Sequence, residues 1–160
     1  MVSSVLDLAC GGGRHARFLA RRGHAVEAVD RDAQALVTLA GVAGVTTTCA
    51  DLEGGPWPYA GRRFDAVVVT NYLHRPLFRA IAEALADRGV LLYETFMRGH
   101  GAIGKPSNPA FLLEPGELLT AFGGLTVVAF EQGRVDSPWP AVLQRVCAVR
   151  AAAEALTLPG

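Results

Sequence analysis

The segment that most constrains the fold of this 160-residue chain is a short apolar run that leads into three consecutive glycines. The run covers Val5–Leu8, and Gly11-Gly12-Gly13 stand just behind it. An apolar run that exits through glycines into a helical pattern is typical of a buried parallel strand. Parallel strands need crossover connections, so this segment indicates an α/β fold in which strands and helices alternate.

Strand and helix patterns alternate along the residues that follow. Four further strands are expected at Ala25–Val29, Val45–Cys49, Phe64–Thr70 and Gly89–Thr95. Helices are expected from Gly13 to Arg22, from Asp32 to about Ala43, from Pro76 to about Ala86 and from Pro115 to about Phe122. The Gly- and Pro-rich segments 51–63 and 97–113 are expected to be loops.

The last two predicted strands differ from the others in their connection. They cover Leu125–Gln132 and Val142–Arg150, and Gly133–Ala141 joins them. This connection is too short for a helical crossover, so the two strands are expected to be antiparallel. Residues 1–150 are therefore predicted to form one domain, a doubly wound open α/β sheet, mostly parallel with a C-terminal antiparallel hairpin. Residues 151–160 are expected to be a tail.

Composition narrows the classes of function. Fifteen Lys and Arg residues balance fifteen Asp and Glu residues, which argues against nucleic-acid binding through net positive charge. No apolar run reaches the ~20 residues of a membrane helix, and the first residues lack the pattern of a secretion signal. Cys10, Cys49 and Cys147 lack the spacing of metal ligands, so we expect reduced thiols, a cytoplasmic location, no membrane partner and no metal site.

Three carboxylates stand beside the expected strand ends. Asp7 precedes the glycine loop, where it suits a cationic amine better than a pyrophosphate. Asp30 ends the second strand, where a carboxylate accepts hydrogen bonds from a ribose diol. Asp51 follows the third strand and is placed to accept from the exocyclic amine of adenine. Gly11 to Ala16 also fits the dinucleotide-binding pattern G-x-G-x-x-G/A, so the glycines alone would also allow a dinucleotide. The three carboxylates favour a nucleoside ligand with a cationic amine instead.

Together these motifs resemble the class I S-adenosylmethionine-dependent methyltransferases. Residues 5–13 are similar to the first motif of that class, Asp30 to the acidic end of its second strand, and Asp51-Leu52 to its adenine-side motif. Phe64–Val69 resembles the strand that leads into its active-site motif. Two later segments resemble bacterial tellurite-resistance-type small-molecule methyltransferases, namely Gly104–Pro109 and Leu113–Leu119. The resemblance implies a Rossmann-like methyltransferase fold and transfer of a methyl group to a small-molecule nucleophile.

The resemblance also implies a role for each motif residue in holding S-adenosylmethionine. Asp7 would hold the amine of the methionine part, Asp30 the ribose, and Asp51 with the backbone of Leu52 the adenine. Asn71 would contribute from the end of the fourth strand. The loop backbone would cradle the methionine part at Ala9, Cys10, Gly11 and Gly13.

On the acceptor side the sequence leaves alternatives open. Ligands of open α/β sheets bind outside the carboxyl ends of the strands, which makes His74 and Glu94 the catalytic candidates. His74 would act as a base near neutral pH, or it caps or packs at the start of the next helix. Glu94 would face the same pocket, or it pairs with Arg98. A further set of residues forms either a cationic mouth for an anionic acceptor or scattered solvated charges: Arg75, Arg98, His100 and Lys105.

Two other functions stay open beside methyl transfer. An NAD-type oxidoreductase shares the glycine pattern, although Asp7 disfavours it and no convincing catalytic Tyr/Lys or His/Asp arrangement is present. A non-catalytic methyltransferase-like binding module would keep the fold without turnover. Only Met1–Ser4 precede the first strand, where the resembling class carries helices. We therefore expect an open acceptor side with exposed apolar surface that a second subunit covers in a homodimer, or else a native chain that starts upstream.

Overall fold

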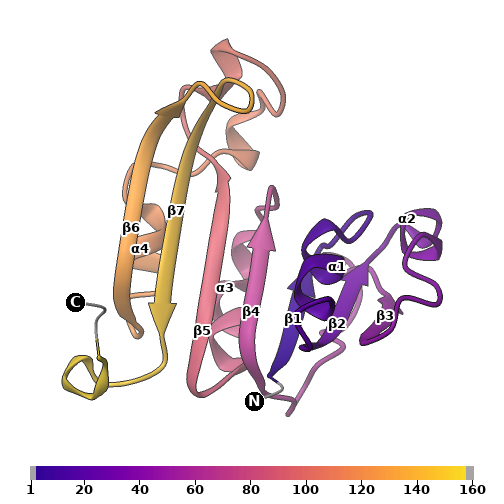
Figure 1. The fold of residues 1–160 in the computed structure, drawn as a ribbon. Helices are drawn as coiled ribbons and strands as arrows, with labels where there is room; N and C mark the ends of the chain where they lie inside the picture. Colours follow the sequence, from indigo (N-terminus) through magenta and orange to yellow (C-terminus); the bar gives the residue numbers. More distant parts are fainter. Residues whose placement is uncertain (1–2, 158–160) are drawn as a thin grey trace.

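The structure, a computed structural model, describes residues 3–157. Its central element is a seven-stranded sheet with the order β3-β2-β1-β4-β5-β7-β6 (Figure 1). The strands cover Ser4–Leu8 (β1), Ala25–Asp30 (β2), Val45–Cys49 (β3), Phe64–Thr70 (β4), Leu85–Phe96 (β5), Thr126–Val135 (β6) and Ala141–Val149 (β7). The strands β1 to β5 pair in parallel, whereas β7 is antiparallel to both β5 and β6. This confirms the predicted doubly wound sheet with its antiparallel C-terminal hairpin.

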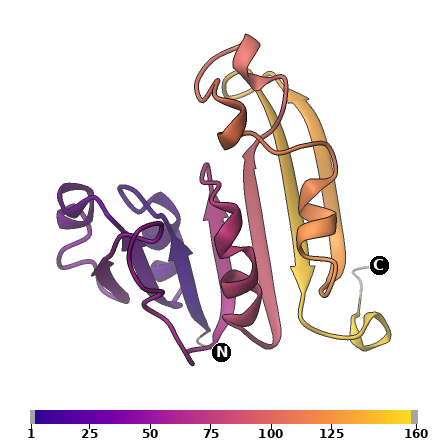
Figure 2. The same cartoon turned by 180° about the vertical axis from the view of Figure 1, so that it is seen from behind.

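Short helices lie on both faces of the sheet, with α1 and α2 on one face and α3 and α4 on the other (Figures 1 and 2). The helices cover Arg14–Ala20 (α1), Ala33–Val37 (α2), Phe78–Glu83 (α3) and Glu117–Ala121 (α4). Single 3-10 turns occur at Arg75–Leu77 (η1), His100–Ala102 (η2), Pro109–Phe111 (η3) and Ala153–Ala155 (η4). No helix of residues 3–157 has the length and apolar character needed to cross a membrane.

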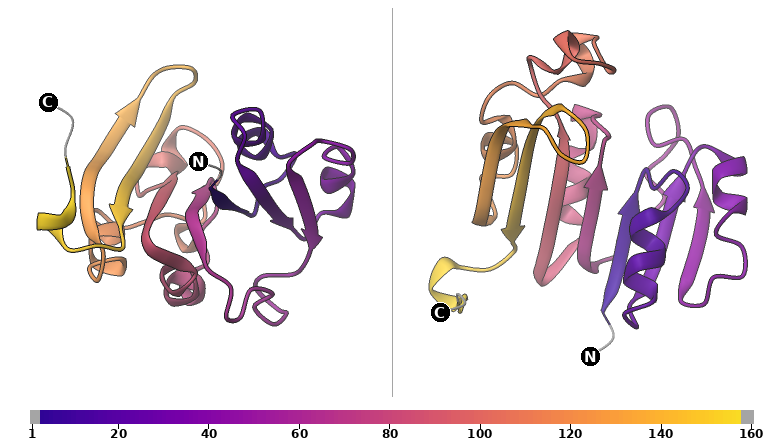
Figure 3. Two further views of the ribbon diagram at one scale, coloured as in Figure 1. Left: turned by 60° about the horizontal axis from the view of Figure 1, so that its bottom comes forward. Right: turned by 45° about the horizontal axis from the view of Figure 1, so that its top comes forward.

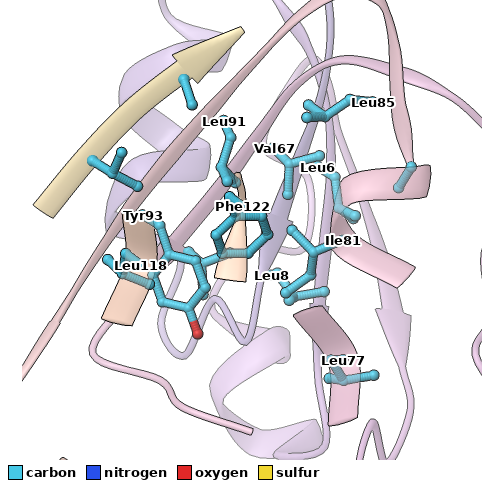
Figure 4. Close-up of a cluster of buried hydrophobic side chains, with 14 of the residues drawn as sticks. Leu6, Leu8, Val67, Leu77, Ile81, Leu85, Leu91, Tyr93, Leu118 and Phe122 are labelled. Atoms are coloured by element: carbon cyan, nitrogen blue, oxygen red, sulfur yellow. The ribbon is translucent and has the colours of Figure 1, made fainter. Parts of the chain in front are cut away.

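The larger apolar core lies between the sheet and the helices α3 and α4 (Figure 4). Its members include Leu6, Leu8, Val67, Ile81, Leu91, Tyr93 and Phe122, each at most 1 % exposed. A smaller cluster beneath α1 and α2 joins Ala16 and Leu39 to Val26 and Ala28 of β2. The central strands are thus buried on both faces, which is why their sequences are nearly continuous apolar runs.

All four predicted helices are shorter than expected, and α2 and α3 illustrate the difference. Helix α2 ends at Val37 instead of near Ala43. Helix α3 ends at Glu83, before its expected end, because Leu85 already pairs with Phe64 in the sheet. Strand pairing with a neighbour that is distant in sequence thus overrides local helix propensity in this segment.

One face of the antiparallel half of the sheet carries no helix among the described residues (Figure 3). Two cross-strand rows of side chains lie on it, namely Leu92, Cys147 and Ala129 in one row and Glu94, Arg145 and Glu131 in the other. A groove of about 450 Å³ lies between these rows and α1. Leu92 is 45 % exposed there, and Phe18 of α1 is 50 % exposed. We call this surface the open face.

Candidate active site

A cavity of about 420 Å³ lies at the carboxyl ends of the parallel strands. This volume is within the range of about 300–1,000 Å³ that is usual for small-molecule sites. Its lining residues are Ala9, Asp30, Arg31, Ala50, Asp51, Leu52, Glu53, Asn71, Tyr72, Leu73, Thr95, Phe96, Pro106 and Phe111. They follow each of the strands β1 to β5 or belong to the loop at 97–113. The cavity therefore spans the point between β1 and β4 where the strand order reverses, the usual ligand site of such sheets.

Two backbone hydrogen bonds fix the side chain of Asp30 at the end of β2. Its Oδ2 accepts from Gly11 N (2.8 Å), and its Oδ1 accepts from Asp32 N (2.9 Å). The carboxylate thus ties the glycine loop to the second strand and faces the cavity in one orientation. Each oxygen keeps a further acceptor position, which suits a pair of neighbouring hydroxyl groups.

The glycine loop brings bare main chain to the cavity. Ala9 and Gly11 have φ angles of 52° and 53°, in the left-handed region that alanine adopts rarely. A Cβ added at Gly11 would meet open space, so nothing in the protein fills the volume beside this backbone. Gly13 has a different reason to be glycine, because at its φ of 72° a Cβ would lie 2.4 Å from Leu39 Cδ2.

Two residues of the first motif lie beneath the loop and not in the cavity lining. Asp7 is 1 % exposed, and its Oδ2 accepts a hydrogen bond from Ala16 N (2.9 Å). Burial raises the pKa of Asp7 to about 6, in opposition to that hydrogen bond. Burial, with Asp7 and Asp30 nearby, raises the pKa of Cys10 to about 12, so Cys10 stays a thiol and is no nucleophile. Asp7 does not line the cavity, so of the contacts that the resemblance implies with a ligand amine, the one through water stays a prediction.

The segment after β3 forms one wall of the cavity. Hydrogen bonds from the backbone N–H groups of Gly54 and Glu53 hold the pKa of the exposed Asp51 below its ordinary value. Leu52 is buried in the larger core and lines the cavity with its remaining surface. The Tyr72 hydroxyl donates to Glu53 Oε1 (3.2 Å), which joins the segment after β3 to the segment after β4.

Asn71 stands at the boundary between β4 and the cavity in a strained conformation. Its φ is 54°, and its N–H donates to Glu94 O of the neighbouring strand (2.9 Å). The hydroxyl of the buried Tyr93 donates to Tyr72 O (2.8 Å), which fixes the next residue as well. A residue other than glycine adopts the left-handed backbone conformation only where its surroundings hold it there, and such positions are concentrated at functional sites.

The two catalytic candidates from the sequence are not brought together. His74 is the N-cap residue of the turn η1, as in the alternative that it caps or packs there, although its side chain makes no capping hydrogen bond. It does not line the cavity. Glu94 points to the open face, where Arg145 Nε lies 2.9 Å from Glu94 Oε2. Thr95 and Phe96 are the β5 residues in the lining of the cavity, and Glu94 is not among them. The placement of Glu94 in the acceptor pocket, and its alternative pairing with Arg98, are both wrong.

The expected cationic mouth is also wrong, because each of its members is engaged within the protein. Arg75 pairs with Glu117 (2.6 Å) and also donates to two backbone oxygens of the loop at 97–113. Arg98 pairs with Glu114. His100 is 4 % exposed, with both ring nitrogens hydrogen-bonded to backbone groups, and Lys105 Nζ donates to Ser107 Oγ (3.0 Å). The alternative of scattered solvated charges agrees with the exposed Arg75, Arg98 and Lys105, but it is wrong for the buried His100.

Of the site residues named from the sequence, the cavity thus brings together Ala9, Asp30, Asp51, Leu52 and Asn71. It leaves Asp7, Cys10, Gly11, Gly13, His74 and Glu94 outside its lining. Sequence reasoning missed Glu53, Tyr72, Phe96 and Phe111 among others. Tyr72 and Phe96 stand at predicted strand ends, and that position was a signal for them. Nothing in the sequence marks Phe111, which reaches the cavity through the fold of its loop.

Solved structures share this architecture over most of the chain. TehB from Haemophilus influenzae superposes with a TM-score of 0.78 at 17 % identity, over 94 % of this chain and 58 % of TehB. The N-methyltransferase NodS from Bradyrhizobium japonicum superposes with a TM-score of 0.70 at 17 % identity, over 92 % of this chain and 85 % of NodS. An S-adenosylmethionine-dependent methyltransferase from Mesorhizobium loti gives 0.72 at 20 % identity, over 93 % and 91 % of the two chains. The chain therefore spans less than two thirds of TehB.

No curated protein matches the sequence significantly. The sequence pattern of the methyltransferase domain family, in contrast, matches residues 5–89. This region contains the glycine loop and four strand ends of the cavity, with Asp30, Asp51 and Asn71. The chain therefore belongs to the methyltransferase domain family and has the fold of the S-adenosylmethionine-dependent enzymes.

Proposed function

We propose that this methyltransferase domain moves the methyl group of S-adenosylmethionine to a small-molecule nucleophile. The observation that carries the proposal is the continuity of one cavity over five strand ends. Residues at the ends of β1, β2 and β3 provide bare backbone for an amino-acid group and carboxylates that accept hydrogen bonds from a nucleoside. The part over β4 and β5 is then left for a second molecule. A transfer reaction needs such a shared site, because donor and acceptor must meet in one geometry.

The chain's own residues would hold the cofactor from the strand ends. Asp30 accepts hydrogen bonds from the ribose hydroxyls, and Asp51 accepts one from the adenine amine beside the backbone of Leu52. The bare backbone of residues 9–13 makes room for the methionine part. Asp7 acts on the ammonium group of that part through its charge from beneath the loop, since its side chain already bonds to the backbone of α1.

The contribution of the protein to the chemistry is alignment. The cofactor supplies a methyl group on a positively charged sulfur, which is already activated. The chain must hold the acceptor in line with the bond that breaks, and Asn71 borders both parts of the cavity where this alignment is needed. His74 and Glu94 lie outside the lining, so the proposal assigns them no proton transfer.

Two titrations and one transfer assay test the proposed function. Calorimetry with S-adenosylhomocysteine is expected to show binding to one site, and calorimetry with NAD is expected to show none. Methyl-labelled S-adenosylmethionine is then incubated with a panel of small acceptors, and label is expected in at least one of them. Binding of NAD in place of S-adenosylhomocysteine would make the chain an oxidoreductase. Cofactor binding without transfer to any acceptor would make it a non-catalytic module.

We also propose the boundaries and surroundings of this domain. Residues 1–150 form the cofactor-binding domain and 151–160 a tail, a division supported by the end of β7 at Val149. The proposed location is the cytoplasm, in keeping with the three free cysteines. The proposed assembly is a homodimer that covers the open face, because the groove there is lined mainly by apolar side chains.

A further inference from the structure

The charged side chains that line the cavity are mostly acidic. Asp30, Asp51 and Glu53 are carboxylates, and Arg31 is the one cationic side chain in the described lining. Arg31 follows β2, on the side of the cavity that the proposed function gives to the cofactor. The part over β4 and β5 therefore has no lining cation within residues 3–157. Glu53 is the carboxylate that adjoins this part, because the hydroxyl of Tyr72, which follows β4, donates to it. An anionic acceptor would meet this carboxylate without a counter-charge in the described lining.

Two phenylalanine rings line the cavity, one from the end of β5 and one from the loop at 97–113. The ring of Phe96 stacks on that of His100, with centroids 4.2 Å apart and an angle of 26° between the planes. His100 is in turn held in place, since its Nδ1 accepts from Val142 N (3.2 Å) and its Nε2 donates to Lys105 O (3.0 Å). The Phe96 ring is thus a fixed apolar surface at the cavity.

Phe111 supplies a second ring on an anchored backbone. Its turn η3 is capped by Asn108 Oδ1, which accepts from Ala110 N (3.0 Å), and Arg75 Nη1 donates to Ala110 O (2.9 Å). The side chain is nevertheless 50 % exposed while it lines the cavity. A flat apolar ligand beside it would remove this ring from water, which is favourable.

Glu53 supplies the charge at the mouth. Burial and the adjacent Glu53 carboxylate raise the pKa of Tyr72, so its hydroxyl keeps its proton and donates to Glu53 Oε1. The other carboxylate oxygen of Glu53, Oε2, takes no hydrogen bond within the described residues. A carboxylate oxygen in this state accepts from a cationic N–H group.

From these contacts we infer that the methyl acceptor is an amine with a flat apolar body, whose ring lies against Phe96 and Phe111 and whose nitrogen enters on the side of Glu53. The inference rests on the proposed methyl transfer. An amine that binds in its cationic form first releases one proton to water, which frees its lone pair. The lone pair of the neutral amine then forms the N–C bond, and the electrons of the S–C bond return to sulfur, which becomes a neutral thioether. The methylated nitrogen carries the positive charge and releases its extra proton to water.

Binding measurements on the protein saturated with S-adenosylhomocysteine test the acceptor class. The probes are 2-phenylethylamine, its carboxylate counterpart 3-phenylpropanoate, and selenite as an inorganic oxyanion. The amine is expected to bind at least about tenfold more tightly than either anion. Phe111→Ala is expected to weaken amine binding about tenfold, because the aromatic ring of the bound amine loses its apolar contact with Phe111. Glu53→Gln is expected to reduce the preference for the amine over the carboxylate about fivefold.

Phe18→Ala is the matched control, because Phe18 is also 50 % exposed but lies on the open face. It is expected to leave amine binding unchanged. The inference is overturned if either anion binds as tightly as the amine, or if Phe111→Ala and Phe18→Ala have equal effects. Failure of S-adenosylhomocysteine to bind at all would instead refute the proposed function, so the two failures are distinguishable.

Discussion

Asp30 combines a structural and a ligand-binding role in a single carboxylate. The Asp30→Ala change removes the proposed charge-assisted hydrogen bonds to the ribose, and it also releases Gly11 N, to which Asp30 bonds at 2.8 Å. We expect S-adenosylhomocysteine binding to weaken by about 1.5–3 kcal/mol in calorimetry.

The control is Asp136→Ala, since this exposed carboxylate pairs with Arg134 in the C-terminal hairpin, away from the cavity. Circular dichroism checks that both variants are folded. If Asp30→Ala binds the ligand as well as Asp136→Ala does, Asp30 does not belong to the site.

Asp7 makes the stability of the protein depend on pH. Its pKa is raised by burial from 3.8 to about 6, so the folded state binds more protons than the unfolded state between these values. The destabilising effect of Asp7 is therefore absent below about pH 4, grows as pH rises to about 6, and is constant above it. Asp7→Asn removes this ionisation, and its amide oxygen still accepts from Ala16 N–H.

The measured quantity is the free energy of unfolding of Asp7→Asn minus that of the wild type. We expect this difference to rise by about 3 kcal/mol between pH 4 and pH 7. Asp65→Asn is the control, because Asp65 is exposed and bonds to Ser4 at the other end of the sheet. A difference for Asp7→Asn that does not change with pH would contradict the raised pKa.

At the scale of elements, one buried amide positions helix α4 against β7. Gln144 is fully buried, its Oε1 accepts from Leu118 N (2.7 Å), and its Nε2 donates to Glu114 O (3.0 Å). Gln144→Leu keeps the volume but leaves two backbone groups without partners. We expect the free energy of unfolding to fall by about 2–4 kcal/mol in urea denaturation. The exposed Gln34→Leu should change it little, and equal stability of the two variants would show that water replaces the lost bonds.

Elements with a strong local signal could be predicted from the sequence. The strands Val45–Cys49 and Phe64–Thr70 have the expected bounds. The first is a β-branched run that is followed by the loop at 51–63, and the second is an apolar run that this loop precedes. The strand ends then placed Asp30, Asp51 and Asn71 at one edge of the sheet, where the structure also has them.

Other features depend on contacts that the sequence does not reveal. An apolar parallel strand is buried on both faces, so its pattern does not show which face its last residues take, and Glu94 was assigned to the wrong one. The backbone that carries Phe111 is held by Arg75, whose Nη1 donates to Ala110 O, 35 positions further along the chain. No local pattern carries that information.

For the whole molecule, the open face is the surface that remains to be covered. Leu92 lies in its apolar row, flanked by Cys147 on the neighbouring strand. We expect the wild type to sediment as a dimer and Leu92→Lys as a monomer, because a charge in an apolar contact is costly to bury. Val37→Lys is the control, since Val37 is 64 % exposed on α2. A wild type that stays monomeric at every concentration tested would contradict the homodimer.

The position of β7 has a consequence for how the chain is made. Within residues 3–157, β7 is the last strand in the sequence, yet it lies between β5 and β6, and β6 pairs with no other described strand. While the chain leaves the ribosome, β6 has no partner, and one edge of β5 is open until residues 141–149 have emerged. Unpaired edges of this kind invite aggregation and the attention of chaperones. A nonsense mutation at Ala141 would therefore remove two strands from the sheet although it deletes only one.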